Sequence, residues 1–437
     1  MNEIVSNLLV YGSLPEDSIL WQLADICEKL KEGTETKAAL RTRVFHQVKN
    51  LLTVATDYAF DKNLWHNYLT FLLITNENPF SLVCEKMGAQ EGTVNNFVTH
   101  DFDMFKELFD YDFSWLEKEL SIDCFTQLTH YQAIRKKELM YNKNVSEKVR
   151  NLSEKLETAE SGADFFQYVT EFYKDYGVGM FGLNKAFRIA ENKDGSIRFL
   201  PINNMDTVML DDLIGYELQK KKLVENTQAF CDGKAANNVL LFGDSGTGKS
   251  TSIKAIVNQF YPQGLRMIEI YKHQFKDLST IIAQIKNHNY KFIIYMDDLS
   301  FEEFEIEYKF LKAVIEGGVE TKPDNVLIYA TSNRRHLIKE TWKDREDMEH
   351  SEDLHRSDTM EEKLSLVNRF GLSIFYAKPN KEGFNEMAVA LARRAGITPE
   401  VMTDEEICYE ANRFEMRGGG LSGRTAQQFA NYLLTIK

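Results

Sequence analysis

The sequence has few cysteines, and none of them is placed for a familiar role. The five cysteines lie far apart and include no Cys-x-x-Cys pair: Cys27, Cys84, Cys124, Cys231 and Cys408. This scatter argues against a disulfide framework and against a zinc site, and it is typical of a chain in a reducing compartment. We therefore interpret each cysteine as a small buried hydrophobic residue and expect a cytoplasmic protein.

Long apolar runs and an excess of basic charge are also missing. No stretch approaches the roughly 18 uninterrupted apolar residues of a membrane span, so we expect none. Residues Met1 to Ile4 show no basic start before an apolar core, so we expect no signal peptide. The formal net charge is −14, from 52 basic and 66 acidic residues. This balance disfavours a constitutively basic nucleic-acid surface but leaves a local basic patch open.

The length and the periodicity of the chain predict more than one domain. At 437 residues, 43% of them apolar, the sequence predicts two or three globular domains. Residues 1–175 keep apolar residues at helical spacing and predict a helical N-terminal domain, with a role in partner recognition left open. The helices expected there cover residues 40–55, 64–73, 101–109, 123–142 and 145–173. We interpret the many aromatic residues of this region as helical core rather than as a partner surface.

The remaining residues predict an α/β domain between a short junction and a helical end. Residues 176–207 are expected to form a glycine-rich junction whose hairpin has strands at 186–190 and 197–202. Residues 208–380 alternate between strand and helix, which predicts a parallel sheet with helices on both faces. Residues 381–437 are expected to be helical, with Thr403 and Glu406 as a capping box and Ser422 as a further cap. The expected α/β elements are strands at 239–242, 265–270, 292–296, 326–331 and 372–376, and helices at 251–260, 275–287, 303–316 and 360–369.

The most informative segment runs from Gly243 to Ser250 and reads Gly-Asp-Ser-Gly-Thr-Gly-Lys-Ser. An expected strand precedes it and an expected helix follows, which is the context that a phosphate-binding loop requires. The glycines let successive N–H groups point at phosphate oxygens, and the helix adds its positive N-terminal end. Lys249 is expected to reach the β- and γ-phosphates, and Ser250 to ligate Mg²⁺. The expected nucleotide contacts here are Gly243, Asp244, Ser245, Gly246, Thr247, Gly248, Lys249, Ser250 and Thr251.

Two other expected strands end in polar residues. Residues 292–296 lead into Asp297 and Asp298, and residues 326–331 lead to Asn333. Asp297 is expected to hold Mg²⁺ opposite Ser250, and Asp298 to orient or deprotonate an attacking water. Asn333 is expected to hydrogen-bond the γ-phosphate or that water, unless it serves only to form a turn.

In this order the loop, the acidic strand and the polar strand resemble an AAA+ ATPase. The resemblance implies binding of ATP and Mg²⁺, a P-loop parallel sheet with a helical C-terminal lid, and a homo-oligomer. Residues 367–371 are similar to the family segment with the arginine finger, which implies that Arg369 acts in trans on a neighbouring subunit. Residues 423–425 are similar to the segment with the second sensor arginine, which implies a role for Arg424. Residues 211–216 resemble the segment that closes over adenine, which implies contacts from Ile214 and Gly215.

Within the AAA+ proteins, the chain resembles the bacterial family named domain of unknown function 815. The resemblance covers roughly residues 170–437, and the helical N-terminal region, which has no sharp motif, is also expected in that family. The segments that carry it are 237–239, 296–302, 330–337, 361–366 and 422–429.

The catalytic carboxylate departs from the wider AAA+ pattern. Most members carry glutamate where this chain has Asp298, whose side chain is one methylene shorter. Because small misplacements cost large factors in rate, slow hydrolysis stays open, and Glu302 or Glu303 is a candidate substitute.

Other charged residues leave further alternatives. Arg334 and Arg335 compete with Arg369 as the finger, and Arg369 also suits a helix end favoured by the helix dipole. The charged segment 339–362 contains His350 and His355 at a spacing that fits no standard metal site, so we interpret it as a solvated or partner-contact loop.

Three functions remain open at this point. The first is an ATPase that hydrolyses ATP to ADP and phosphate and remodels or assembles a protein partner bound by the N-terminal region. The second is a loader acting on nucleic acid, which the acidic balance does not favour. The third is a slow switch, in which ATP binding orders the domains and hydrolysis resets them.

Overall fold

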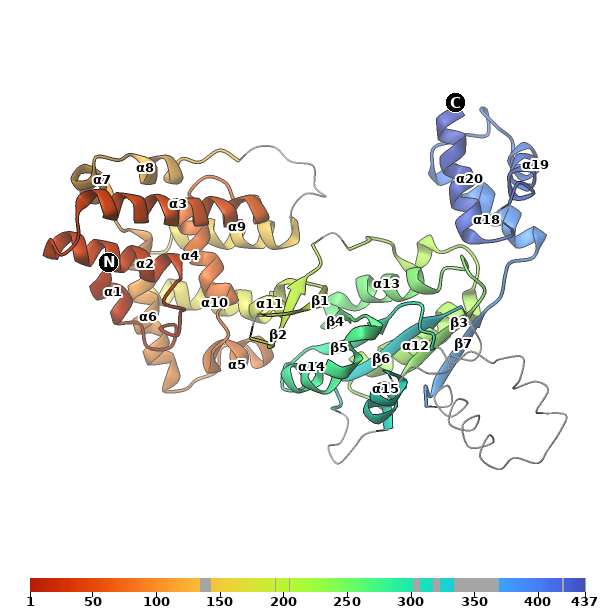
Figure 1. Ribbon diagram of the computed structural model, residues 1–437, viewed down its shortest axis with the longest axis horizontal. Coiled ribbons are helices and arrows are strands. Elements are labelled where there is room, and N and C mark those ends of the chain that lie inside the picture. The colour runs from red at the N-terminus through yellow and green to blue at the C-terminus, as the bar shows by residue number, and fades with distance from the viewer. Residues whose placement is uncertain are drawn as a thin grey trace. The chain divides into compact units, whose positions relative to one another are not determined.

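The computed structural model describes residues 1–133, 143–192, 194–203, 205–301, 307–316, 323–333, 369–418 and 420–436. The chain divides into two compact units, Met1–Asn184 and Lys185–Lys437 (Figure 1). Within the described residues, no helix has both the length and the apolar character needed to cross a membrane.

The first unit is helical, as expected. Its helices are α1 (Asn2–Ser6), α2 (Ile19–Glu32), α3 (Lys37–Tyr58), α4 (Leu64–Thr75), α5 (Pro79–Met87), α6 (Val94–Phe109), α7 (Ser114–Leu120), α8 (Cys124–Thr129), α9 (Lys143–Glu157), α10 (Gly162–Tyr176) and α11 (Gly179–Leu183). The aromatic residues Phe102, Phe105 and Phe109 are buried in its apolar core, in agreement with their interpretation as core residues.

Two helices that we predicted in this unit are longer than those in the structure. The helix expected over 145–173 is two helices, α9 and α10, because the Ser161 side chain accepts from the Asp164 N–H and starts α10 with a capping box. The helix expected over 123–142 ends as α8 at Thr129, and the Tyr131 carbonyl instead accepts from the Lys62 N–H at 3.0 Å. Residues 134–142 lie outside the described part of the chain.

The second unit is built on a seven-stranded sheet of order β2-β1-β4-β5-β6-β3-β7. The strands are β1 (Ala186–Glu191), β2 (Ile197–Pro201), β3 (Val239–Gly243), β4 (Leu265–Glu269), β5 (Lys291–Met296), β6 (Val326–Ser332) and β7 (Leu372–Tyr376). All neighbouring pairs are parallel except β1 with β2. Every residue of β6 is buried, so the sheet is covered on both faces, as the alternation of strand and helix predicted.

The hairpin that we expected in a separate junction belongs to this sheet. Strand β1 pairs in parallel with β4, and Phe187, which lies beside Ile268, is fully buried. The hairpin itself is confirmed, but its apolar side packs on the α/β domain, so it extends the sheet at one edge. The second unit accordingly begins at Lys185 rather than near residue 208.

Helices connect the strands and form the end of the chain. They are α12 (Glu217–Cys231), α13 (Lys249–Phe260), α14 (Leu278–Ile285), α15 (Glu307–Glu316), α18 (Lys381–Arg394), α19 (Asp404–Glu415) and α20 (Gly423–Ile436). The helix expected from residue 275 starts instead with a 3-10 segment, Lys272–Asp277, followed by α14. The helix expected over 360–369 lies outside the described residues except for Arg369.

The helices after β7 form a small helical subdomain, which we call the lid. Helices α18, α19 and α20 share an apolar core that includes Phe384, Ile407 and Phe429 (blue in Figure 1). The capping box of Thr403 and Glu406 is present, and Ser422 Oγ accepts from the Thr425 N–H at 3.1 Å. Both caps that we predicted for this region are therefore confirmed.

Candidate active site

The loop between β3 and α13 is held in a shape that glycine alone tolerates. Gly243, Gly246 and Gly248 have φ values of 131°, 77° and 90°, in a region that side chains disfavour. A Cβ atom added to Gly243 would lie 2.2 Å from the carbonyl oxygen of Tyr376, on the neighbouring strand β7. The loop leads directly into α13, whose positive N-terminal end suits an anion.

Lys249, the first residue of α13, fixes this loop from within. Its Nζ donates to the carbonyl oxygens of Gly243 at 3.0 Å and Asp244 at 2.6 Å, and to Asn333 Oδ1 at 2.9 Å. The residue is only 6% exposed, and burial lowers the pKa of Lys249, an effect that nearby carboxylates partly oppose. The ammonium group therefore lies at the point where the ends of β3 and β6 meet.

Ser250 and Asp297 lie together on the other side of the loop. Asp297 Oδ1 accepts from Ser250 Oγ at 2.7 Å and from Thr331 Oγ1 at 2.6 Å. Partial burial acts to raise the pKa of Asp297, but the hydrogen bonds from Thr331 and Ser250 outweigh it, so the pKa lies below its usual value. A hydroxyl oxygen beside an ionised carboxylate is a donor set that suits Mg²⁺.

Asp298 has an unusual backbone and a fixed side chain. Its φ is 49°, which few residues other than glycine adopt, although aspartate and asparagine tolerate it best. Its N–H donates to Thr331 Oγ1 at 2.9 Å, and its Oδ1 accepts from Asn333 Nδ2 at 2.8 Å. These bonds hold an exposed carboxylate at the edge of the sheet.

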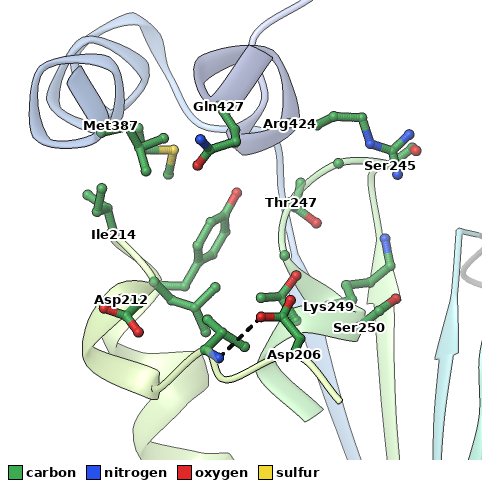
Figure 2. A pocket seen from close by; sticks show the side chains of 18 of the residues that line it. Asp206, Asp212, Ile214, Ser245, Thr247, Lys249, Ser250, Met387, Arg424 and Gln427 are labelled. Carbon is green, nitrogen blue, oxygen red and sulfur yellow. Dashed lines mark hydrogen bonds between the residues drawn. The ribbon is translucent and has the colours of Figure 1, made fainter. Parts of the chain in front are cut away.

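These groups line one end of a cavity of about 1000 Å³. Figure 2 shows Lys249 and Ser250 at this polar end, with Ile214 and Met387 facing each other at the other. The apolar end is lined by Leu213, Ile214, Tyr216, Met387 and Leu391. A polar end that fits phosphates and an apolar end that fits a base make a cavity of the size and character of a nucleotide site.

The lid closes one side of the cavity through two arginines. Arg394, on α18, donates to the carbonyl oxygens of Asp212 at 2.5 Å and Asp211 at 2.9 Å. The Arg424 N–H, at the start of α20, donates to the Gly246 carbonyl at 3.1 Å. The lid is thus attached to both ends of the cavity, and Arg424 lies over the phosphate-binding loop (Figure 2).

Most of the predicted contacts line this cavity. They are Ile214, Ser245, Gly246, Thr247, Gly248, Lys249, Ser250, Thr251, Asp297, Asp298, Asn333 and Arg424. Gly243 and Gly215 do not line it but shape it: a Cβ on Gly215 would lie 3.4 Å from Met387 Cε. The side chain of Asp244 points elsewhere, because its Oδ2 accepts from the Lys378 N–H at 2.9 Å. Its expected contact with nucleotide is therefore limited to the backbone.

Arg369 lies before the amino end of β7, whereas the loop follows the carboxyl end of the neighbouring strand β3. Strand β7 runs parallel to β3, with Leu372 beside Val239 and Tyr376 beside Gly243. The loop follows Gly243, whereas Arg369 precedes Leu372, so a strand of roughly 13 Å separates them. Arg369 is not among the residues that line the cavity, so within its own chain it does not reach this site.

Several of the alternatives lie in parts of the chain that the structure does not describe. They are Glu302, Glu303, Arg334, Arg335, His350 and His355. Within the described residues, no cluster of three or more histidine, cysteine or acidic side chains is arranged to hold a metal ion.

Sequence reasoning missed the residues that other segments bring to the cavity. Those outside the segments to which the sequence assigned a role are Asp206, Val208, Thr331, Met387, Leu391, Arg394, Ala395, Gln427 and Gln428, whereas Asp212, Leu213, Tyr216 and Gly423 lie in the predicted segments 211–216 and 423–425. Thr331 had a signal, since it lies one residue before the end of β6, and the neighbouring strand β5 leads directly into Asp297. Met387 and Leu391 had none, because helical periodicity identifies the apolar face of α18 but not which part of that face meets the cavity.

A family model described as "Protein of unknown function (DUF815)" matches residues 183–436. No curated protein matches the sequence. Among solved structures, a variant of RuvB from Thermotoga maritima is similar with a TM-score of 0.36 and 17% identity, over 52% of this chain and 65% of that one. PCH-2 of C. elegans is similar with a TM-score of 0.35 and 18% identity, over 52% and 65%.

The match to the family model confirms the resemblance inferred from the sequence. The fold class is confirmed as well: a mostly parallel sheet with a helical C-terminal part follows a helical N-terminal region. This chain spans slightly less than two thirds of the length of the two solved structures, whose likeness concerns the fold.

Proposed function

This chain belongs to the DUF815 family, and we propose that it binds Mg²⁺-ATP in the cavity between sheet and lid and hydrolyses it to ADP and phosphate. The observation that carries the proposal is the convergence of three strand ends. The loop after β3, the acids after β5 and the asparagine after β6 meet within hydrogen-bond distance of one another. This set would provide a phosphate cradle, a metal-side carboxylate and a carboxylate for the attacking water.

The binding roles follow from the two ends of the cavity. The loop N–H groups and Lys249 would hold the β- and γ-phosphates, and the apolar residues around Ile214 and Met387 would enclose adenine. Ser250 and Asp297 would hold Mg²⁺, directly and through water. When bound, Mg²⁺ would neutralise part of the phosphate charge and polarise the phosphoryl oxygens.

Asp298 is the residue that we propose acts on water. A water beside its carboxylate would attack the γ-phosphorus as the bond to the β–γ bridging oxygen breaks, and Asp298 would accept the proton that the water loses. Asn333 holds the carboxylate in position. Arg424, at the loop, would stabilise charge on the transferring phosphoryl group.

The position of Arg369 supports a homo-oligomer as part of the proposal. Because it lies a strand length away from the cavity of its own chain, it would serve the cavity of a neighbouring subunit, as an arginine finger does in trans. The helical N-terminal unit would then recognise the protein partner on which the ATPase acts.

The first test is ATP turnover measured against protein concentration, with Lys249→Ala as the blank. We expect specific activity to rise with concentration, because a second subunit completes the site. Turnover equal to the blank at every concentration would remove hydrolysis from the proposal.

A mixing experiment tests the role of Arg369. Each of Arg369→Ala and Lys249→Ala should be inactive alone, while their mixture should regain part of the activity, since one subunit keeps an intact loop and its neighbour an intact finger. A mixture no more active than its components would exclude Arg369 as the finger.

A slow conformational switch is the second candidate. It is favoured by Asp298, which is shorter than the usual glutamate, and by the lid contacts of Arg394 and Arg424, which would respond to nucleotide. Tight nucleotide binding with turnover below about one per minute would favour the switch over a motor; ordinary turnover lies between about 1 and 10³ s⁻¹.

A further inference from the structure

A tyrosine hydroxyl is buried beneath the proposed metal site without a hydrogen-bond partner. Tyr295 lies on β5, two residues before Asp297, and its side chain is 0% exposed. Its hydroxyl is among the few buried polar atoms of the described residues that make no hydrogen bond. Native proteins rarely tolerate such a group, because it loses its bonds to water and gains nothing in return.

Three polar side chains of the proposed metal site lie close to this hydroxyl. Ser250, Asp297 and Thr331 are close enough to act on it, yet none of them meets it with the geometry of a hydrogen bond. A tyrosine hydroxyl carries one proton that it can donate, so Tyr295 is a potential donor to these neighbours.

The same face of the sheet satisfies its other tyrosines. Tyr329, beside Tyr295 on β6, is also 0% exposed, but its hydroxyl bonds Thr227 Oγ1 at 2.8 Å and Asn226 Nδ2 at 3.1 Å. Tyr376, on β7, donates to Ser252 Oγ at 3.0 Å. This layer of the core thus supplies partners where a hydroxyl is purely structural, and Tyr295 differs from its neighbours in lying under Asp297.

Asp297 has capacity for another donor. A carboxylate accepts up to about four hydrogen bonds, and those described from Ser250 and Thr331 both go to Oδ1. A serine that ligates a cation through an oxygen lone pair keeps its O–H as a donor, but ligation would shift the serine and the carboxylate that it contacts. A fixed donor besides Thr331 would then keep Asp297 oriented toward the metal.

We propose that Tyr295 is a positioning residue for Asp297: its hydroxyl donates to the Asp297 carboxylate when Mg²⁺-nucleotide engages Ser250. The inference rests on the proposed function, since it assigns to Tyr295 a role at the same metal site. The hydrogen bond from Tyr295 to Asp297 is absent from the structure and would form when Mg²⁺-nucleotide binds, so Tyr295 would stabilise the Mg²⁺-bound form.

The test compares Tyr295→Phe with Tyr329→Phe in the full-length protein. Thermal unfolding is measured in EDTA, and binding of a fluorescent ATP analogue is titrated with Mg²⁺. Tyr295→Phe removes an unpartnered hydroxyl, so the Tm in EDTA should stay the same or rise, while the Mg²⁺ concentration at half-saturation should rise about tenfold. Tyr329→Phe removes a satisfied hydroxyl, so its Tm should fall while its Mg²⁺ midpoint stays that of the wild type.

The opposite signs separate positioning from simple packing. A wild-type Mg²⁺ midpoint in Tyr295→Phe would overturn the proposal, as would a loss of Tm as large as that of Tyr329→Phe. Failure of the wild-type protein to bind the analogue in any Mg²⁺ concentration would instead overturn the proposed function itself, and the inference with it.

Discussion

Replacing Asp298 with asparagine isolates the proposed chemical step from binding and folding. The two side chains have the same shape, and asparagine tolerates the φ of 49° at this position as well as aspartate does. The backbone bond from the residue 298 N–H to Thr331 is unchanged, and an asparagine oxygen can still accept from Asn333 Nδ2. The variant loses one property, which is the ability to accept a proton from water.

The expected size of the effect follows from this single loss. A positioned general base contributes roughly 10²- to 10⁴-fold, so turnover should fall by that factor, or about 2.7 to 5.4 kcal/mol in activation free energy. Nucleotide affinity should change less than about threefold, because in the proposed site the phosphates would be held by the loop and Lys249 rather than by Asp298. The Tm should stay within about 2 °C, because surface changes without lost contacts are nearly neutral.

Asp244→Asn provides the matched control. Asp244 is also a carboxylate of this loop region, but its side chain accepts from the Lys378 N–H and does not line the cavity. An asparagine oxygen can still accept from the Lys378 N–H, so the replacement should cost at most about 1 kcal/mol of stability and leave turnover within about twofold. The assays are steady-state phosphate release, binding of a fluorescent ATP analogue and thermal unfolding on both variants. If Asp298→Asn turns over ATP at the wild-type rate, Asp298 is not the base.

Two further predictions concern stability. Gly243→Ala should destabilise the protein by about 3 kcal/mol or more, because the new Cβ would lie 2.2 Å from the Tyr376 carbonyl oxygen at a φ of 131°. Gly233→Ala is the control, with a φ of 74° and no atom within 4 Å of the new Cβ, and it should cost only about 1 kcal/mol. Equal losses of stability for the two variants in urea unfolding would contradict the steric argument. The pKa of Glu77 is raised to about 7, mainly because its carboxyl group is partly buried and to a lesser extent because the charge of Glu85 lies nearby. The folded state therefore holds this proton more tightly than the unfolded state, so its stabilising effect is full below about pH 4.5 and is lost as the pH rises through 7. Because much of the Glu77 side chain is exposed, the loss should be at most about 1 kcal/mol, and Glu77→Gln should abolish it; an unchanged pH profile in that variant would refute the assignment.

The polar end of the site could be predicted because it depends on local patterns. A glycine-rich turn between a strand and a helix specifies its own backbone, and strands that end in Asp297 and Asn333 must bring those residues to one edge of a parallel sheet. Parallel neighbours share their carboxyl edge whatever their order, so the prediction did not require the order β5-β6-β3. For the same reason Lys249, Asp298 and Asn333, which were predicted to share one site, lie together in the structure.

The rest depends on packing that no local pattern specifies. Met387 and Gln427 reach the cavity because the lid attaches through Arg394 and Arg424, and an arginine on a helix gives no sign of which carbonyl it will bind. Strand β1 carries only a short apolar pattern, so its pairing with β4 was not evident. The break before Gly162, by contrast, had a signal, because Ser161 and Asp164 have the spacing of a capping box.

One side chain links the two halves of the proposed chemistry. Asn333 accepts from Lys249 through Oδ1 and donates to Asp298 through Nδ2. This orientation is required by its partners, because a lysine ammonium only donates and an ionised carboxylate only accepts. A bound γ-phosphate would compete with Oδ1 for the Lys249 ammonium and leave the bond from Nδ2 to Asp298 in place. Arrival of the phosphate would therefore release one end of the Asn333 amide while the other end still holds Asp298. Nucleotide binding and the position of the attacking water would thus be coupled through this one residue.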